Sequence, residues 1–198
     1  MISICIIEKF ANPSPMGLAA FAGTTFLLSL FNVQARGITS PNLIVGMAMA
    51  YGGLIQLLAG MWEFAVGNTF GATAFSSYGG FWISFGCIFI PGTGIMEAYT
   101  TASKAGQLDN ALALYLFTWF IFTSIMLLAT FRSSIGLVVL FFFLDCTFLL
   151  LAVGSTMPHV ESITKAGGAF GNIAWYIAAS ALLSSEGSSI KLPNPSLR

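Results

Sequence analysis

The residues that decide the fold are Asn12-Pro13-Ser14-Pro15-Met16-Gly17-Leu18, where a short polar segment meets the first long apolar run. Asn12 is a favourable helix N-cap, and Pro13 then falls at the first helical position, where its missing N–H would have had no partner. Pro15 also lies in the first turn, so it breaks no backbone hydrogen bond. The stretch predicts a helix with a rigid start, which points the positive end of its dipole at whatever lies in front of it.

Gly17 has no side chain, so we expect it to let another backbone or a small ligand approach the helix closely. The free N–H groups and the dipole at this helix start would favour a ligand that is an anion. The alternative interpretation is a structural cap at the border of a membrane, and the spacing alone does not separate the two.

The composition is that of an integral membrane protein. Of 198 residues, 57% are hydrophobic and only 7% are charged, and the mean hydropathy is +0.88. A typical soluble domain is about 25% charged, so these few charges are not enough to cover a surface that faces water. The net charge of zero argues against a nucleic-acid partner.

The sequence carries no signature of an enzyme. It contains no nucleophile motif, no His/Cys metal cluster and no glycine-rich phosphate loop. Cys5, Cys87 and Cys146 are scattered and are best interpreted as small apolar side chains. We therefore expect neither a metal nor a cofactor. The apolar patch in residues 1–10 is too short for a secretory signal with a cleavage site, so we also expect no cleaved signal.

Six apolar runs reach the roughly 20 residues that a helix needs to cross the hydrocarbon core of a bilayer. They are Pro15–Val33, Asn42–Val66, Gly71–Ile90, Ala111–Thr130, Ile135–Val153 and Ala166–Ser185. The sequence thus predicts an all-α membrane protein with six transmembrane helices in residues 12–185, between a short N-terminal tail (1–11) and a polar C-terminal tail (186–198). The basic residues slightly favour cytoplasmic termini, and we expect the plasma membrane as the location.

The third and sixth runs begin with similar sequences. Phe70–Phe75 and Phe170–Trp175 both read Phe-Gly-x-x-Ala-aromatic. Because the two runs are three spans apart, they would start on opposite faces of the membrane, as a 3+3 inverted repeat requires. The match covers only six residues, and coincidence is the alternative.

Polar side chains inside the runs are candidates for function, because an ionisable group in lipid is costly unless it is paired or wet. Glu63 shares a helix face with Gln56, seven residues earlier, so the two could line a polar path; the alternative for Glu63 is an interfacial carboxylate that reaches water. For Asp145, near the middle of the fifth run, a role in proton movement and structural pairing with another helix are equally compatible. Thr24 is a weaker candidate, because threonines in membrane helices often bond their own backbone.

The stretch Asn12–Leu18 and four later stretches resemble the acetate uptake transporter family. This family includes bacterial succinate–acetate permeases and fungal acetate and ammonia-export proteins. Residues 12–18 are similar to the family's Asn-Pro-Ala-Pro-Leu-Gly-Leu signature, with Ser14 and Met16 as mild departures. The tail before them is shorter than in fungal members, which leaves open whether the N-terminus is truncated. The other matching stretches, the last two closest to the fungal members, are Tyr51–Gly60 with Glu63, Gly67–Gly79, Phe141–Asp145 and Ala174–Tyr176.

The resemblance implies six helices around a pore in each protomer, a ring of six protomers, and proton-coupled uptake of acetate and related small monocarboxylates. It places Phe21, Tyr78 and Leu144 at a narrow hydrophobic constriction. On both grounds together, the predicted pore and substrate-binding residues are Asn12, Pro13, Pro15, Gly17, Phe21, Thr24, Gln56, Tyr78 and Leu144, with Glu63 and Asp145 as the proton-coupling candidates.

Three functions stay open on the sequence. The first is a monocarboxylate/proton symporter, and the second is an acetate or ammonia channel or exporter of the same fold. The third is an acetic-acid sensor that has lost transport. The residues of the constriction and the Asn12 motif are all present, which favours transport. The sequence does not fix the preferred substrate, the direction of flux or the carboxylate that carries the proton.

Overall fold

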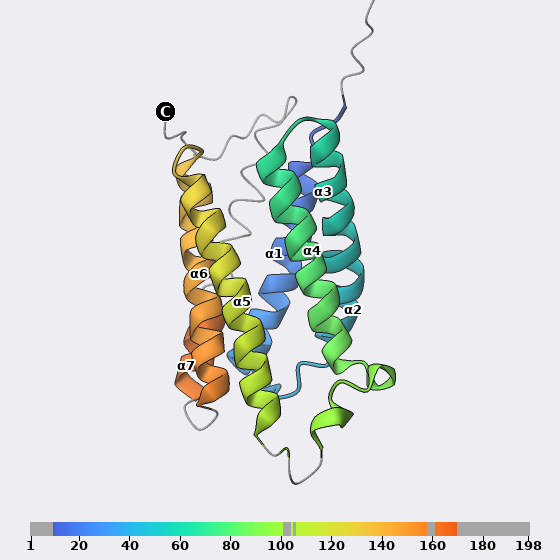
Figure 1. Ribbon diagram of the computed structural model, residues 1–198, viewed down its shortest axis with the longest axis vertical. Helices are drawn as coiled ribbons and strands as arrows, with labels where there is room; N and C mark the ends of the chain where they lie inside the picture. The colour runs from blue at the N-terminus through green and yellow to red at the C-terminus, as the bar shows by residue number, and fades with distance from the viewer. Residues whose placement is uncertain (1–9, 101–103, 105, 158–160, 170–198) are drawn as a thin grey trace, which may run out of the picture.

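The computed structural model describes residues 10–100, 104, 106–157 and 161–169 as a bundle of nearly parallel and antiparallel helices (Figure 1). Its helices are α1 (Ser14–Asn32), α2 (Ile44–Met49), η2 (Ala50–Ile55), α3 (Gln56–Ala65), α4 (Thr69–Phe89), α5 (Gln107–Thr130), α6 (Ile135–Thr156) and α7 (Glu161–Ala169). Short 3₁₀ turns, Ala35–Gly37, Pro91–Thr93 and Glu97–Tyr99, lie in the connections. The prediction of an all-α fold is confirmed.

Four helical stretches in the described residues are long and apolar enough to cross a membrane: Ser14–Asn32, Ile44–Ala65, Gln107–Thr130 and Ile135–Thr156. Helix α4 is as long, with 21 residues, which is about 30 Å of helix, but its glycines, serines and threonines make it less apolar. The predicted run 166–185 lies mostly outside the described residues, as does Phe170–Trp175. The count of six spans and the inverted repeat therefore stay predictions.

The predicted start of α1 is wrong by one residue. The helix begins at Ser14, so Pro13 is the N-cap and Pro15 is the second helical residue. Asn12 lies outside the helix, and its side-chain oxygen accepts the backbone N–H of Ser14 at 3.0 Å. An asparagine that bonds the backbone two residues on forms an Asx turn, so Asn12 stabilises the turn in front of the helix without being its cap.

The ends of two later helices also differ from the prediction. Helix α5 begins at Gln107 rather than at Ala111, directly after Gly106, whose φ of 78° suits glycine. Its first turn carries Asp109, which the positive end of a helix dipole favours, although the polarity of this turn suggests a loop. The predicted connection 154–165 is shorter, because α6 extends to Thr156 and α7 starts at Glu161.

The second span is interrupted by a single stretch of π-helix, η2, between α2 and α3. Two adjacent glycines in this stretch face different neighbours. A Cβ on Gly52 would meet Thr24 of α1, whereas one on Gly53 would meet Ile83 of α4. Such π-turns are frequent at functional positions, and this one ends directly before Gln56.

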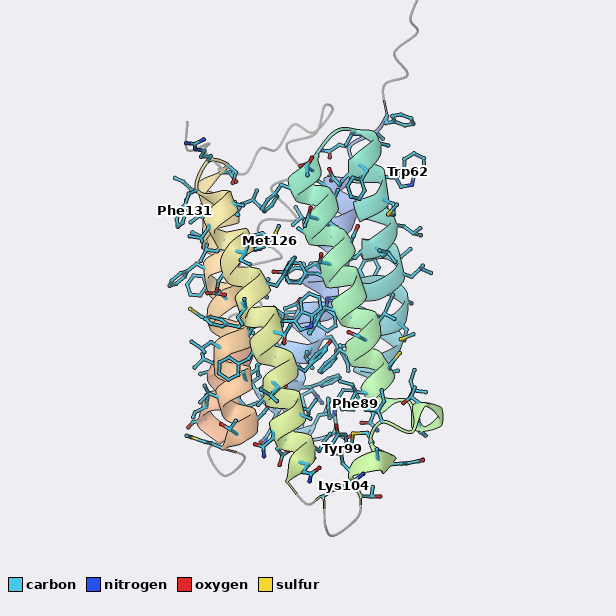
Figure 2. All side chains as sticks on the ribbon, viewed as in Figure 1. Trp62, Phe89, Tyr99, Lys104, Met126 and Phe131 are labelled. Atoms are coloured by element: carbon cyan, nitrogen blue, oxygen red, sulfur yellow. The ribbon has the colours of Figure 1, made fainter. Side chains whose placement is uncertain are left out.

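The outer surface of the bundle is apolar, as a lipid environment requires. On α5 the exposed side chains Leu114, Ile121, Ile125 and Leu128 follow a helical spacing. Trp62 and Phe131 are exposed at one end of the bundle, and Phe89 and Tyr99 lie toward the other (Figure 2). Aromatic side chains at both ends are typical of the two membrane–water interfaces.

Candidate functional site

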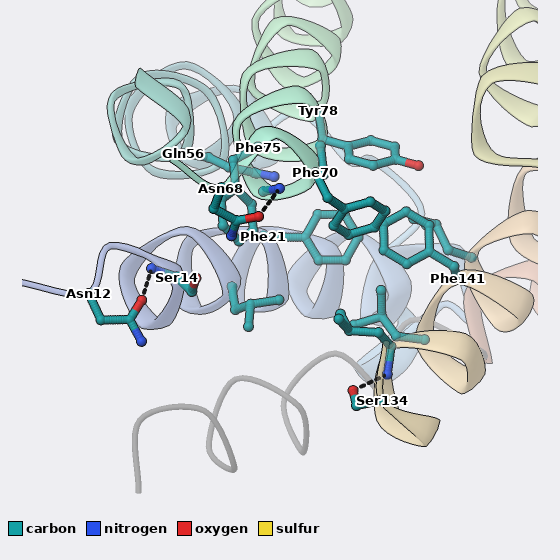
Figure 3. A pocket seen from close by; sticks show the side chains of 16 residues that line it. Asn12, Ser14, Phe21, Gln56, Asn68, Phe70, Phe75, Tyr78, Ser134 and Phe141 are labelled. Atoms are coloured by element: carbon teal, nitrogen blue, oxygen red, sulfur yellow. Dashed lines mark hydrogen bonds between the residues drawn. The ribbon is translucent and has the colours of Figure 1, made fainter. Parts of the chain in front are cut away.

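A cavity of about 280 Å³ lies between α1, α4 and α6, with one residue from α3 (Figure 3). Each of the three helices contributes a stripe of side chains with the spacing of a helix face. The stripes are Ser14, Leu18 and Phe21 on α1; Gly71, Ala74, Phe75 and Tyr78 on α4; and Leu137, Leu140, Phe141 and Leu144 on α6. Since a water molecule occupies about 30 Å³ in the liquid, the cavity has room for a small organic acid.

Phe21, Tyr78 and Leu144 all line this cavity and come from three different helices. The rings of Phe21 and Tyr78 are 5.7 Å apart, and the side chains of all three residues are buried. Phe141 from α6 lies beside them, with its ring 6.2 Å from Tyr78. The cavity is thus bordered by a group of large apolar side chains that approach one another from separate helices.

Three helix N-termini meet at one end of the cavity, because α1, α4 and α6 all begin at the same end of the bundle (Figure 1). Ser14 is the first residue of α1, and Asn68 and Ser134 are the N-caps of α4 and α6. All three line the cavity, as does Asn12. The sequence predicted one such helix start; three together present more positive partial charge to this end of the cavity.

Glu63 connects two of these helix starts. Its carboxylate accepts a hydrogen bond from the Ser14 hydroxyl at 2.5 Å and another from the Asn68 amide at 2.7 Å. Asn68 in turn accepts the backbone N–H of Gly71 at 3.0 Å. Although Glu63 is 0% exposed and does not line the cavity itself, both of its partners do. A buried carboxylate therefore lies one hydrogen bond away from the cavity on two sides.

Gln56 differs from Glu63 in having no hydrogen-bond partner among the residues that the structure describes. It is 0% exposed and lines the cavity, yet in the described part of the chain neither its amide nitrogen nor its amide oxygen has a hydrogen-bond partner. Buried polar atoms are nearly always bonded to protein or to ordered water. Gln56 therefore carries an unused donor and an unused acceptor at the cavity wall.

Comparison with known proteins agrees with this geometry. The model of the GPR1/FUN34/yaaH family matches residues 3–198. The chain belongs to this family. Its fold is similar to that of the bacterial acetate channel SatP, with a TM-score of 0.79 and 35% identity over 94% of this chain and 100% of that one. The protein is thus an integral membrane protein.

Fungal relatives of the family share more sequence with this chain. Acetate permease A of Emericella nidulans is 50% identical over 94% of this chain and 66% of that protein. Ammonia transport outward protein 2 of Saccharomyces cerevisiae is also 50% identical, over 93% of this chain and 66% of that protein. The chain spans just under two thirds of the length of these curated relatives.

Several residues predicted for the pore of this family member do not line the cavity. Thr24 donates its hydroxyl to the Ala20 carbonyl of its own helix at 2.9 Å, and Pro13 and Pro15 serve the start of α1. Gly17 was expected to admit a backbone or a ligand, and that expectation is wrong: its open face receives the ring of Phe75, which a Cβ would meet at 2.7 Å.

Asp145 also lies outside the cavity, although its neighbour Leu144 lines it. The carboxylate accepts a hydrogen bond from the Ser124 hydroxyl of α5 at 2.9 Å. Of the two interpretations that the sequence left open for Asp145, the structure thus displays the contact with another helix. A role for Asp145 in proton movement stays a prediction.

Most of the remaining cavity residues were not predicted. The spacing of Ser14, Leu18 and Phe21 could have marked one face of α1, once Phe21 was singled out. The same holds for Leu137, Leu140 and Leu144 on α6. Ser134 could have been found as an N-cap by its position directly before an apolar run. Nothing in the local sequence indicates that these stripes face one another.

Proposed function

We propose that this protein transports acetate and related small monocarboxylates across the membrane, coupled to protons, and is not an enzyme. The observation that carries the proposal is the cavity itself. Its lining combines three helix N-termini, the large apolar side chains of Phe21, Tyr78 and Leu144, and the buried amide of Gln56, which has no hydrogen-bond partner among the described residues. The family membership and the names of the relatives support the same substrate class.

The chemistry of the substrate fits this arrangement. A carboxylic acid with a pKa of about 4.3 is almost wholly ionised at neutral pH, and an anion crosses hydrocarbon only at a large desolvation cost. The positive ends of α1, α4 and α6 would attract the anion to one mouth of the cavity. The amide of Gln56 can donate to its carboxylate, and the methyl group suits the apolar constriction.

Proton coupling is assigned first to Glu63 and second to Asp145. Glu63 is buried, and its neutral partners Ser14 and Asn68 line the cavity, so a proton taken up by the substrate could exchange with it through one intervening group. Asp145 bonds Ser124 on the side of α6 next to α5. This ranking rests on which carboxylate is connected to the cavity.

The alternative is a channel or exporter of the same fold for acetate or ammonia. The similarity to ammonia transport outward protein 2 favours it, because a neutral ammonia molecule would also pass an apolar constriction. A sensor that has lost transport is less well supported, since the cavity residues are in place. By family resemblance we also propose a ring of six protomers in the plasma membrane with cytoplasmic termini.

Uptake of labelled acetate into proteoliposomes, with and without an imposed pH gradient, tests the proposal. A proton symporter accumulates acetate above the level reached in protein-free liposomes when the outside is acidic, whereas a channel for the acetate anion lets the anion equilibrate. Tyr78→Ala serves as the structural control, because it opens the constriction and should abolish coupled accumulation while it increases passive flux. Equilibration without accumulation in the wild type would favour the channel, and no flux of acetate at all would reject acetate transport.

A further inference from the structure

Helix α5 contributes no residue to the cavity, yet two adjacent residues in its middle are bonded to the helices that form the constriction. The hydroxyl of Thr123 lies 2.8 Å from the phenol oxygen of Tyr78 on α4. The hydroxyl of Ser124 donates to Asp145 at 2.9 Å, and Asp145 directly follows Leu144 on α6. One turn of α5 is thus connected to two of the three constriction residues, to Tyr78 directly and to Leu144 through its neighbour.

The hydrogen bond to Thr123 gives the Tyr78 ring a direction that apolar packing alone would not give. Tyr78 is surrounded by aromatic rings: the centroid of Phe122 lies 5.5 Å away, that of Trp119 6.0 Å and that of Phe148 6.4 Å. Such rings fill space but cannot satisfy a phenol O–H, which needs a partner when it is buried. Thr123 is itself 0% exposed, so the two hydroxyls satisfy each other within an apolar layer.

The consequence of losing this bond follows from the position of Tyr78 at the cavity wall. A buried hydroxyl without a partner is costly, and a ring that turns toward the cavity would regain hydrogen bonds to water. That rotation would move the phenol group into the space between Phe21 and Leu144 and change the cross-section of the constriction. The bond to α5 keeps the polar end of Tyr78 away from that space.

We propose that Thr123 is a positioning residue that sets the width, and with it the size selectivity, of the constriction by holding Tyr78 against α5. Ser124 contributes through Asp145 to the placement of the α6 turn that carries Leu144. This inference rests on the proposed transport function and deepens it, since it names a residue outside the cavity that decides which small solutes pass.

The test compares Thr123→Val with Thr123→Ser and Thr130→Val in proteoliposomes. Valine keeps the shape of threonine but cannot hydrogen-bond, whereas serine keeps the hydroxyl. Thr130 is a matched control, because it lies on the same helix, is 0% exposed and donates only to its own helix, to the Leu127 carbonyl. The readout is the ratio of two fluxes, labelled butyrate over labelled acetate, with methylammonium as a third solute.

We expect Thr123→Val to change the butyrate-to-acetate ratio by about 3- to 10-fold, the range that corresponds to one neutral hydrogen bond. The butyrate-to-acetate ratio of Thr123→Ser and of Thr130→Val should stay within about twofold of the wild-type ratio. A wild-type ratio in Thr123→Val would overturn the proposal. So would a ratio in Thr123→Ser that is changed as much as in Thr123→Val, because then the hydroxyl is not what matters.

Tyr78→Phe removes the same bond from the other side and leaves no phenol that would turn toward the cavity. Adding Thr123→Val to Tyr78→Phe should therefore change the flux ratio no further. If the wild type passes none of the three solutes, the proposed function fails, but the same double-mutant cycle on the Tm of the purified protein still tests the bond. Additive losses in Tm, or additive changes in the ratio, would show that the two residues act independently and would overturn the proposal.

Discussion

The two walls of the cavity are built in different ways. On one side the second span packs directly against α4, and the contact is made by small residues. A Cβ on Gly60 would collide with Ser76, and one on Gly79 would meet the backbone of Leu57 at 2.8 Å. On the other side α5 and α6 pack on each other and reach α4 through aromatic rings, such as Phe81 and Trp119 with centroids 5.1 Å apart.

Because of this difference, one wall of the cavity is rigid and the other can adjust. Where two backbones touch, no side chain is present that could change its rotamer, so the wall formed by α3 and α4 keeps a fixed geometry. Where rings fill the space, a small rotation of one ring can be accommodated by its neighbours. The polar residue that faces the cavity from the second span, Gln56, stands on the rigid wall, whereas the apolar residues of α6 stand on the adjustable one.

The largest effect is expected for Gly79→Ala, which breaks the rigid wall. The new methyl group would lie 2.8 Å from the backbone nitrogen of Leu57 and 3.0 Å from the carbonyl oxygen of Gly53, and neither atom can move without moving its helix. We expect a loss of about 3 kcal/mol in the free energy of unfolding, at the upper end of the usual range for overpacking. Thermal unfolding in detergent measures it.

The adjacent Gly80→Ala is the matched control. Gly80 is exposed, and a Cβ there meets nothing within 4 Å, so the variant should be unchanged or more stable by at most about 1 kcal/mol from the better helix propensity of alanine. Equal Tm losses in the two variants would contradict the view that this wall depends on backbone contact at Gly79.

The next largest effect is expected for Glu63→Gln, because, of the two candidate coupling carboxylates, Glu63 and Asp145, only Glu63 is connected to the cavity. Hydrogen bonds to a charged group contribute about 1.5–3 kcal/mol. Disturbing them therefore corresponds to a change of about tenfold or more in an equilibrium or rate constant. We expect accumulation of acetate driven by a pH gradient to fall by that factor, while Asp145→Asn should retain most of it. Accumulation is measured in proteoliposomes over a series of imposed gradients.

Two results would change this assignment. Full accumulation in both variants would show that neither carboxylate carries the coupling proton. Loss in Asp145→Asn with retention in Glu63→Gln would move the coupling to the adjustable wall. Ser14→Ala provides a further control, because it removes one hydrogen bond to Glu63 and leaves the carboxylate in place, so it should have a smaller effect than Glu63→Gln.

The local sequence was sufficient to predict several of the helices but not the way they meet. Apolar runs gave the ends of α1, α4 and α6 to within a few residues, because hydrophobic length is a property of each segment by itself. The site of η2 was not predictable in the same way, since a π-turn adds one residue to a helix that still reads as a continuous apolar run. Gly52 and Gly53 within it pack closely against Thr24 and Ile83 of other helices, and such contacts cannot be read from the local sequence.

The candidate site shows the same limit. Phe21, Tyr78 and Leu144 were identified through family resemblance, and spacing alone would not have grouped residues from three helices. Gln56 and Glu63 were found as polar groups on one helix face, and the spacing suggested a shared polar path. Among the described residues, however, Glu63 has two hydrogen-bond partners and Gln56 has none. The bond between Ser14 and Glu63 joins residues 49 positions apart, which no local pattern encodes.

The smallest effect is expected for Gln56→Met, and its sign is the informative part. Methionine has nearly the length of glutamine but no amide, so the variant removes two buried polar atoms that have no partner in the described part of the chain. Because an unsatisfied buried polar group is destabilising, we expect the Tm to stay the same or rise. The KM for acetate uptake should increase by about 3- to 10-fold, the equivalent of one neutral hydrogen bond to the substrate.

A replacement on the opposite wall, Leu140→Met, conserves volume and should leave both the Tm and the KM unchanged. If Gln56→Met instead lowered the Tm and left the KM as it was, the amide would be a structural group of the rigid wall, and the polar end of the substrate would have to bind closer to the helix N-termini.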